Sequence, residues 1–207
     1  MNKKKDTTEA VAHPGIVGIL LAAGFSRRFG AQDKLMHTLN TGLTVAGASA
    51  QALRQALPNS VAVVREENLA LQGMLAALGY HVALSKHENA EMADNLKLGV
   101  MAAQSKFPQA SGFVIALADM PFIQPQTITK IADQLLTAAI VQPVFNGKPG
   151  HPVGFSQRFT DALLTIQGDQ GAREILLAHK DEILLLPCND EGILRDIDTM
   201  ADLPGQA

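Results

Sequence analysis

The segment IVGILLA at residues 16–22 is followed at once by AGFSRRFGAQDK at residues 23–34, and these two segments determine how the rest of the chain is interpreted. The first is a continuous apolar run, which is typical of a strand buried on both faces of a sheet. The second contains two glycines and three cations, which is typical of a loop that receives an anion. A central strand with such a loop at its carboxyl end predicts an open parallel α/β sheet.

Further apolar runs and helix-period segments alternate along the chain and support this prediction. The expected strands are residues 16–22, 61–64, 81–84, 113–118, 140–145, 152–155 and 183–186, and the expected helices are residues 45–57, 68–78, 95–103, 127–138, 158–165 and 171–179. Pro58 and Gly79 stand where helices are expected to end, because proline cannot continue a helix and glycine readily takes the left-handed cap conformation. We therefore expect a single-domain, Rossmann-like three-layer sandwich with a mainly parallel sheet.

Composition limits the function classes. The chain has 207 residues, of which 47% are hydrophobic and 18% charged, so it can bury a core without disulfides. We expect one domain at residues 15–207, preceded by a disordered tail at residues 1–14. A net charge of -3 leaves no broad basic surface, which argues against nucleic-acid binding. The single cysteine, Cys188, excludes an internal disulfide, and no apolar stretch has the length of a membrane span. We expect a cytoplasmic protein without a membrane partner.

The glycine-rich loop differs from the two best-known phosphate-binding motifs. Five residues separate Gly24 from Gly30 and Lys34 does not follow the second glycine, so the loop is not a P-loop. No Gly-x-Gly-x-x-Gly occurs here, which weakens a dinucleotide-binding oxidoreductase. From the residues alone, an ordinary strand-to-helix turn with solvated arginine and lysine remains an alternative.

Two segments place carboxylates where a metal ion can be held. Asp119 follows the expected strand at 113–118, and a strand-end carboxylate facing the loop suits Mg²⁺, which takes one or two carboxylates plus phosphate oxygens and water. Asp196 and Asp198 near the end of the chain would lie on the same side if their segment is extended, and either could complete a metal site. Helix caps and turns are the alternative roles for these aspartates.

The sequence LAAGFSRRFGAQDK at residues 21–34 resembles the Leu-Ala-Ala-Gly-x-Ser-x-Arg-Met-Gly-x-x-Lys signature of molybdenum cofactor cytidylyltransferases and related MobA-like nucleotidyltransferases. Phe29 replaces the usual methionine, and one extra residue precedes Lys34. Ala118 replaces glycine in the family's Gly-Asp-Met-Pro, and the Asp-Ile-Asp-Thr segment at 196–199 is shared. The resemblance covers residues 16–203.

The resemblance implies a set of site residues. Arg28 and Lys34 would act in catalysis, and the nucleotide would be bound by Leu21, Ala22, Ala23, Gly24, Arg28, Lys34 and Asn95, the last standing where the family commonly has serine. Mg²⁺ would be held by Asp119 and Asp198, with Asp196 in reserve. His151, in Gly-His-Pro-Val, would contact the acceptor, and its alternative role is that of a surface or turn residue. Arg173, in Gly-Asp-x-Gly-Ala-Arg, would also contact the acceptor, and the alternative for that motif is helix capping by Asp169.

The implied activity is transfer of a nucleotidyl group from a nucleoside triphosphate to molybdopterin, with release of pyrophosphate. Ala22-Ala23-Gly24 resembles the Ala-Ala-Gly version of the family's loop rather than the Ala-Gly-Gly version of its guanylyltransferase relatives, which implies CTP as the donor. If the base packs against this turn, the Cβ of Ala23 narrows a space that glycine would leave open to a purine. The chain would then meet a client molybdoenzyme or chaperone. Another phosphorylated acceptor such as a sugar phosphate, a non-catalytic protein that delivers a cofactor, and an oxidoreductase carrying flavin or nicotinamide are the alternatives.

Overall fold

Buried apolar strands form one continuous sheet, as the alternating sequence pattern predicts. The computed structural model of the chain describes residues 13, 15–24, 29, 33–86, 90–169 and 171–203. Within these residues the strands are β1 (Ile16–Ala22), β2 (Ser60–Arg65), β3 (His81–Ser85), β4 (Gly112–Leu117), β5 (Ile140–Phe145), β6 (Lys148–Pro149), β7 (Val153–Ser156) and β8 (Ile183–Pro187). Only His13 of the expected tail at 1–14 is described, and the other residues of that tail lie outside the described part.

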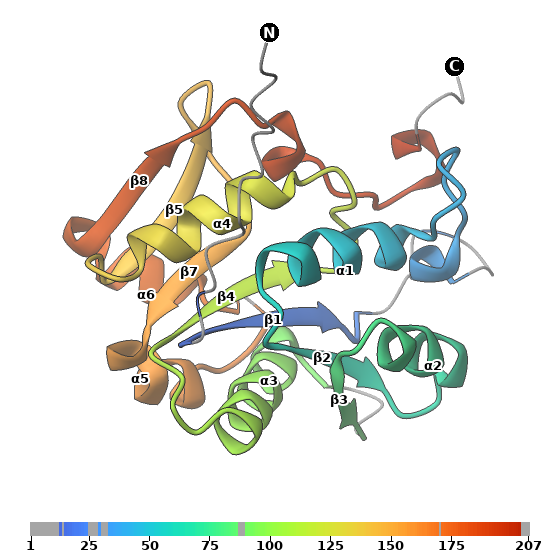
Figure 1. Cartoon of the computed structure of the whole chain (residues 1–207), viewed down its shortest axis with the longest axis horizontal. Coiled ribbons are helices and arrows are strands. Elements are labelled where there is room, and N and C mark those ends of the chain that lie inside the picture. The colour runs from blue at the N-terminus through green and yellow to red at the C-terminus, as the bar shows by residue number, and fades with distance from the viewer. Residues whose placement is uncertain are drawn as a thin grey trace, which may run out of the picture.

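The sheet is mainly parallel and has the order β3-β2-β1-β4-β7-β5-β6, with β8 paired to β5. β1 to β4 run parallel to one another, and β8 runs parallel to β5 (Figure 1). β7 is antiparallel to both of its neighbours, β4 and β5. The expected Rossmann-like α/β fold is confirmed, with an antiparallel insertion on one side of the sheet.

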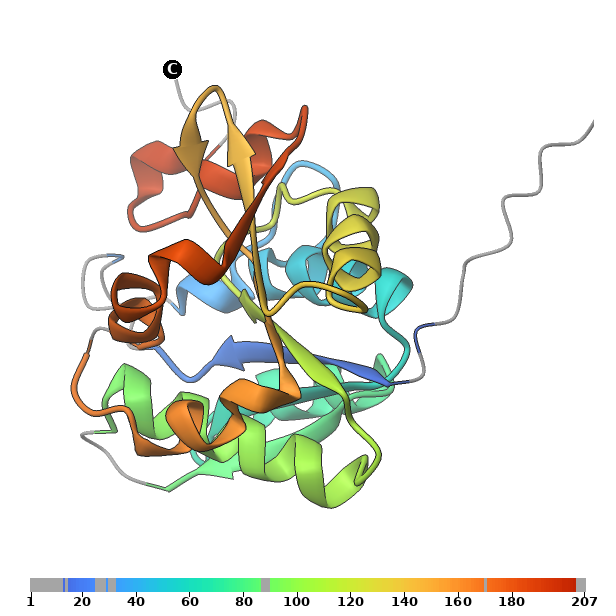
Figure 2. The same cartoon turned by 90° about the vertical axis from the view of Figure 1, so that its left-hand side faces the viewer.

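Helices cover both faces of the sheet and complete the three layers (Figure 2). The helices on one face are α1 (Val45–Ala56), α2 (Leu69–Ala77) and α4 (Pro125–Gln134), and those on the other are α3 (Met92–Lys106), α5 (Thr160–Thr165) and α6 (Arg173–Ala178). Short 3-10 helices are η1 (Lys34–Met36), η2 (Gln157–Phe159), η3 (Lys180–Glu182), η4 (Glu191–Leu194) and η5 (Met200–Asp202). None of the helices in the described part is long and apolar enough to cross a membrane.

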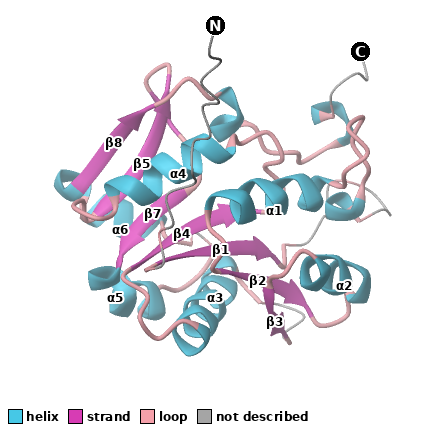
Figure 3. Ribbon diagram, viewed as in Figure 1, coloured by secondary structure: helices cyan, strands magenta, loops and turns pink. Residues whose placement is uncertain are grey.

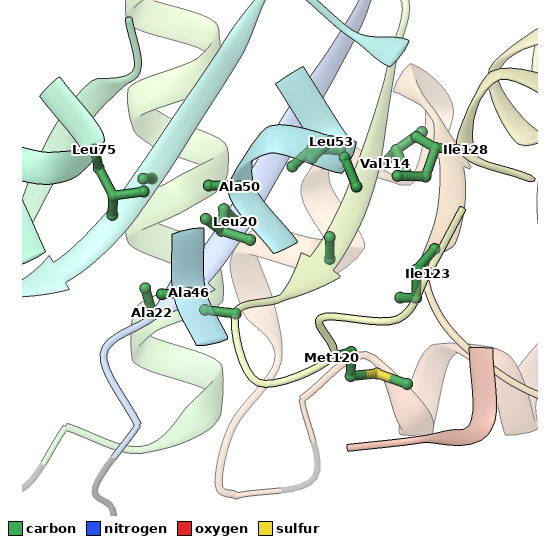
Figure 4. Packing of buried hydrophobic residues seen from close by; sticks show 14 of the residues in the cluster. Leu20, Ala22, Ala46, Ala50, Leu53, Leu75, Val114, Met120, Ile123 and Ile128 are labelled. Carbon is green, nitrogen blue, oxygen red and sulfur yellow. The ribbon is translucent and has the colours of Figure 1, made fainter. Parts of the chain in front are cut away.

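Small residues allow α1 to pack closely on the sheet. Ala46 and Ala50 of α1 belong to the same buried cluster as Leu20 and Ala22 of β1, and Figure 4 shows these four side chains around the end of the strand. Successive side chains of a strand point to opposite faces, so Leu21 joins the other cluster together with α3 residues. β1 is therefore buried on both faces, as its continuous apolar sequence predicts.

Several elements differ from the expected ranges. α3 starts at Met92 rather than residue 95, because Glu91 and Asp94 form a reciprocal capping box that adds a turn. β6, with two residues and a proline, was too short to predict. α4 ends at Gln134, before the expected residue 138. Gly79 has a φ of 86° directly after α2, which is the left-handed conformation expected there.

The chain order makes the edge between β1 and β4 the expected position of a ligand. From β1 the chain passes to β2 through α1 on one face, whereas it reaches β4 through α3 on the opposite face. The connections therefore diverge at the carboxyl ends of β1 and β4, which point to the same edge of the sheet (Figure 3). Ligands of open α/β sheets bind at such points of divergence.

Candidate functional site

The segment after β1 forms the floor of a cavity at this edge. Leu21, Ala23 and Gly24 line a cavity of about 480 Å³, whereas Ala22 packs in the cluster beneath α1. A Cβ added to Gly24 would meet no described protein atom within 4 Å, so packing does not require glycine there. We call this cavity the first cavity. Because Gly24 has no side chain, a ligand in the first cavity can approach its backbone closely.

Lys34, Asp119 and Asp198 converge on the first cavity from three distant parts of the chain. Lys34 Nζ donates to Asp119 Oδ2 at 2.8 Å and to Asp198 Oδ1 at 3.1 Å. Lys34 is 8% exposed. Burial by itself lowers the pKa of Lys34, but the charge of Asp119 and the hydrogen bonds to both aspartates outweigh it, so the pKa lies above its ordinary value of 10.5. The lysine stays charged at neutral pH.

Backbone and side-chain hydrogen bonds hold these three residues in place. Asp33 Oδ1 accepts from the Leu35 amide and caps η1, while Asp33 Oδ2 accepts from Asn68 Nδ2 at 2.6 Å. The Ile197 amide donates to the Asp119 carbonyl at 2.9 Å, which joins the segment after β4 to the segment near the end of the chain. The two candidate carboxylates are thus brought together partly by the main chain.

Asp202 fixes the backbone beside Asp198. Its Oδ2 accepts from the amides of Asp198 and Thr199 and from the Thr199 hydroxyl, which forms a capping box at η5. The helix-capping role considered for the aspartates of this segment therefore belongs to Asp202. Asp198 accepts a hydrogen bond from Lys34, which also bonds to Asp119, whereas exposed Asp196 lies near enough to His151 to influence its pKa.

Two carboxylates of the first cavity could hold a divalent metal ion. Among the described residues, no group of three or more His, Cys, Asp or Glu side chains has the geometry to hold a metal ion. Mg²⁺ in phosphate-binding sites needs only one or two carboxylates, since phosphate oxygens and water complete its shell. Asp119 and Asp198 meet this requirement, because both oxygens reach the same nitrogen of Lys34.

Asn95 lines the first cavity and has a buried side-chain carbonyl without a partner among the described residues. It lies at the end of the first turn of α3 and is only 6% exposed. Its Oδ1 is buried and has no hydrogen-bond partner among the described residues. An unpaired buried carbonyl costs roughly 1–3 kcal/mol, so this side chain is suited to a ligand that donates a hydrogen bond.

The start of α3 is closed by the segment after α5. The Met92 amide donates to Asp169 Oδ1 at 3.4 Å, and the Ala93 amide donates to the Gly168 carbonyl at 3.1 Å. Asp169 therefore caps α3 rather than α6, the helix that follows it in sequence. Its side chain also lines the first cavity. This contact between distant segments has no signal in the local sequence.

A second cavity of about 340 Å³ adjoins the first and shares Leu21, Met92 and Leu117 with it. Its remaining lining residues are Leu96, Ile115, Gln142, His151, Val153, Phe155, Gly171, Ala172, Arg173 and Leu176. Because β7 is antiparallel to β4, with Val153 opposite Ile115, the residues that lead into β7 lie at the carboxyl edge of β4. His151 thereby comes near Asp119, and Arg173 at the first turn of α6 faces the same cavity.

His151 is half-buried and electrically neutral at pH 7. Burial lowers its pKa from the ordinary value of 6.5, and this effect exceeds the opposing influence of Asp119 and Asp196. Its Nδ1 is buried without a hydrogen-bond partner among the described residues. His151 can therefore offer a ligand hydrogen bonding, whereas the positive charge in this cavity comes from Arg173.

The structure brings most of the predicted site residues together. Leu21, Ala23, Gly24, Lys34, Asn95, Asp119 and Asp198 line the first cavity, and His151 and Arg173 line the second. Arg28 lies outside the described residues. The sequence analysis missed Asp33 and Asn68, whose roles depend on distant contacts, and Asp202. The Thr199-x-x-Asp202 spacing is a capping-box pattern that could have revealed the last of these.

Two curated relatives match almost the full length of the chain. Purine catabolism protein PucB of Bacillus subtilis (strain 168) is 31% identical over 197 residues, which are 90% of this chain and 93% of PucB. Nicotine blue oxidoreductase of Paenarthrobacter nicotinovorans is 24% identical over 199 residues, which are 92% of this chain and 95% of that protein.

Solved structures share the fold. The Rv0371C protein of Mycobacterium tuberculosis H37Rv, crystallised in complex with manganese, superposes with a TM-score of 0.72 at 25% identity, covering 91% of this chain and 95% of that one. A nucleotidyl transferase from Methanothermobacter thermautotroptrophicus has a TM-score of 0.76 at 19% identity, covering 90% of this chain and 93% of that one. Residues 18–183 match the family described as the MobA-like NTP transferase domain. The chain therefore belongs to the MobA-like nucleotidyltransferase family.

Proposed function

We propose that the chain transfers the nucleotidyl group of CTP to a phosphorylated acceptor of the molybdopterin type and releases pyrophosphate. The observation that carries this proposal is the meeting of Lys34, Asp119 and Asp198 in a cavity that shares a wall with a second one. A two-substrate transfer needs such adjoining sites, since donor and acceptor must be held together for reaction.

The chemistry asks for positioning and charge compensation. An oxygen of the acceptor phosphate attacks the α-phosphorus of CTP, the bond from that phosphorus to the bridging oxygen breaks, and pyrophosphate leaves with the electron pair. A phosphate nucleophile is already negative, so no general base is required. Lys34, which remains charged, and Arg28 would offset the repulsion between the phosphates and stabilise the transferring group.

A divalent cation fits the same end of the first cavity. Asp119 and Asp198 would hold Mg²⁺, which when bound would neutralise triphosphate charge. The manganese complex of Rv0371C supports the use of a divalent cation, because that protein shares the fold and 25% of its aligned residues with this chain. Asp202 and the Ile197 amide would keep the two carboxylates oriented.

The second cavity favours an acceptor with a flat ring system over a sugar phosphate. Apolar side chains, among them Ile115, Phe155 and Leu176, form most of its wall. A sugar would leave its many hydroxyls without partners on such a wall, whereas a fused heterocycle can pack against it. Arg173 would pair with the acceptor phosphate, and neutral His151 would hydrogen-bond to the acceptor.

Two features of the first cavity favour CTP. The Cβ of Ala23 stands where glycine would leave more room, which disfavours the larger purines by roughly 1–3 kcal/mol, or about 10–200-fold. The unpaired Asn95 Oδ1 can accept a hydrogen bond from the amino group of cytosine, which uracil lacks. Size would thus reject GTP and ATP, and hydrogen bonding would reject UTP.

The test is pyrophosphate release by the purified chain with Mg²⁺, molybdopterin and each of CTP, GTP, ATP and UTP. We expect release with CTP above all, and more GTP use by Ala23→Gly. Preference for GTP or ATP would defeat the CTP assignment alone, and activity with sugar phosphates instead of molybdopterin would defeat the acceptor assignment. Tight binding of CTP without any pyrophosphate release would favour a non-catalytic delivery protein.

A further inference from the structure

The ammonium group of Lys34 stands where the divalent cation is expected. Its Nζ is 2.8 Å from Asp119 Oδ2 and 3.1 Å from Asp198 Oδ1, the carboxylates that would hold the ion. Mg²⁺ lies roughly 2.0–2.1 Å from its oxygen ligands. An ion bound to both oxygens would therefore lie against the ammonium, with strong repulsion between the two cations. Lys34 and the metal ion cannot hold both carboxylates at once.

The triphosphate offers Lys34 another partner. The side chain lines the first cavity together with Gly24 and Asn95, where the phosphates of the proposed donor would lie. Phosphate oxygens and a lysine ammonium form strong, charge-assisted hydrogen bonds. The backbone of η1 is held by Asp33 and its bond to Asn68, so a rotation of the lysine side chain is sufficient for the exchange.

We propose that Lys34 competes with the divalent cation for Asp119 and Asp198. Lys34 binds both carboxylates in the free protein and releases them when its ammonium group moves to a bound triphosphate. The inference rests on the proposed function in taking a triphosphate as the ligand of the first cavity. It makes Lys34 a positioning residue for the metal in addition to a phosphate contact. Metal alone binds weakly, and metal and nucleotide strengthen each other's binding by the same factor.

The decisive experiment titrates the nucleotide-free protein with Mn²⁺ and follows free Mn²⁺ by electron paramagnetic resonance. Lys34→Met removes the competing charge, so we expect it to bind Mn²⁺ at least about 10-fold more tightly than wild type, within the usual range of such couplings. Lys97→Met is the matched control, because Lys97 pairs with Asp94, at a distance of 3.7 Å, and not with Asp119 or Asp198. Equal or weaker Mn²⁺ binding by folded Lys34→Met overturns the proposal.

Lys34→Gln provides an independent variant, and thermal unfolding checks that each protein is folded. The neutral amide should also tighten Mn²⁺ binding. In a second arm, CTP should strengthen Mn²⁺ binding by wild type more than by Lys34→Met, after allowance for Mn²⁺ bound by CTP itself. Equal strengthening in both proteins contradicts the exchange. If CTP binds neither protein, the proposed function fails, whereas the nucleotide-free titration still decides the role of Lys34.

Discussion

The two adjoining cavities differ in how many charged side chains line them. The first cavity is lined by three charged side chains that contact one another, Lys34, Asp119 and Asp198. In the second, the wall is mostly apolar, and Arg173 and His151 are among its few polar groups. The first lies between parallel strands, β1 and β4, and the second lies where β7 runs antiparallel to β4.

Under the proposed function, the first cavity would carry out the transfer and the second would select the acceptor. Charged groups around phosphates serve any nucleotidyl transfer, whatever the acceptor, because they act on the group that is transferred. An apolar wall with a few polar groups recognises the shape of one acceptor. Changes in the first cavity should therefore abolish turnover with every acceptor, whereas changes in the second should alter only how the acceptor is bound.

The largest effect is expected from the carboxylates of the first cavity. Asp119→Asn and Asp198→Asn should each lower Mg²⁺-dependent turnover by roughly 100-fold or more, because a lost ligand leaves the metal and the phosphates poorly compensated. Steady-state pyrophosphate release measures this, with Asp196→Asn as the comparison. Full activity of Asp119→Asn would remove the metal assignment. Full activity of Asp198→Asn together with an inactive Asp196→Asn would transfer the role to Asp196.

A smaller and more selective effect is expected from Arg173→Ala. Loss of a charge-assisted hydrogen bond to the acceptor phosphate costs roughly 1.5–3 kcal/mol, so KM for the acceptor should rise about 10–150-fold. The affinity for CTP should not change, since Arg173 lines only the second cavity. Arg158→Ala is the control, because Arg158 pairs with Glu182. Equal losses for CTP and acceptor would show that the two cavities do not divide the substrates.

The first cavity was predictable because its residues follow strands in the sequence. A carboxylate after a buried strand, such as Asp119, and a glycine after β1, such as Gly24, must lie at one edge of a parallel sheet. The resemblance to a known family added Asp198 and Asn95, which periodicity alone does not reveal. The hydrogen bonds from Lys34 to the two aspartates were not predicted, because Asp119 and Asp198 follow Lys34 in the sequence by 85 and 164 positions.

The second cavity was only partly predictable, because its wall resembles core in the sequence. Ile115 lies within β4 and Phe155 within β7, and an apolar residue in a strand gives no sign that one side of it meets a cavity rather than a helix. His151 and Arg173 were found through motifs. The direction of β7, which brings His151 to the edge of β4, depends on strand pairing and not on local sequence.

Asn95→Leu tests whether the first cavity also selects the base. The leucine has the same branching without the unpaired carbonyl, so we expect a higher Tm for the free protein. CTP binding should weaken about 2–12-fold, the equivalent of roughly 0.5–1.5 kcal/mol for one neutral hydrogen bond, and its preference over UTP should shrink. Gln104→Leu on the exposed side of the same helix is the control. Unchanged discrimination between CTP and UTP would exclude Asn95 from base selection.

The smallest effect concerns His151, and it is seen in stability rather than turnover. Because the pKa of His151 in the folded chain is below its ordinary value, the unfolded chain binds more protons between the two pKa values. The contribution of His151 to the free energy of unfolding is therefore fully present above about pH 6.5 and is lost as the pH falls through the folded-state pKa.

Urea unfolding from pH 8 to pH 5 measures this contribution. His151→Gln cannot be protonated, so its stability should fall less on acidification than that of wild type, and the difference should appear only below about pH 6.5. His81→Gln, at an exposed position at the start of β3, is the control for replacing a histidine with glutamine. Parallel curves for wild type and His151→Gln would mean that His151 is as easily protonated in the folded chain as in water. The second cavity would then offer the acceptor two positive charges at pH 6 instead of one, and the contrast with the charged first cavity would be weaker.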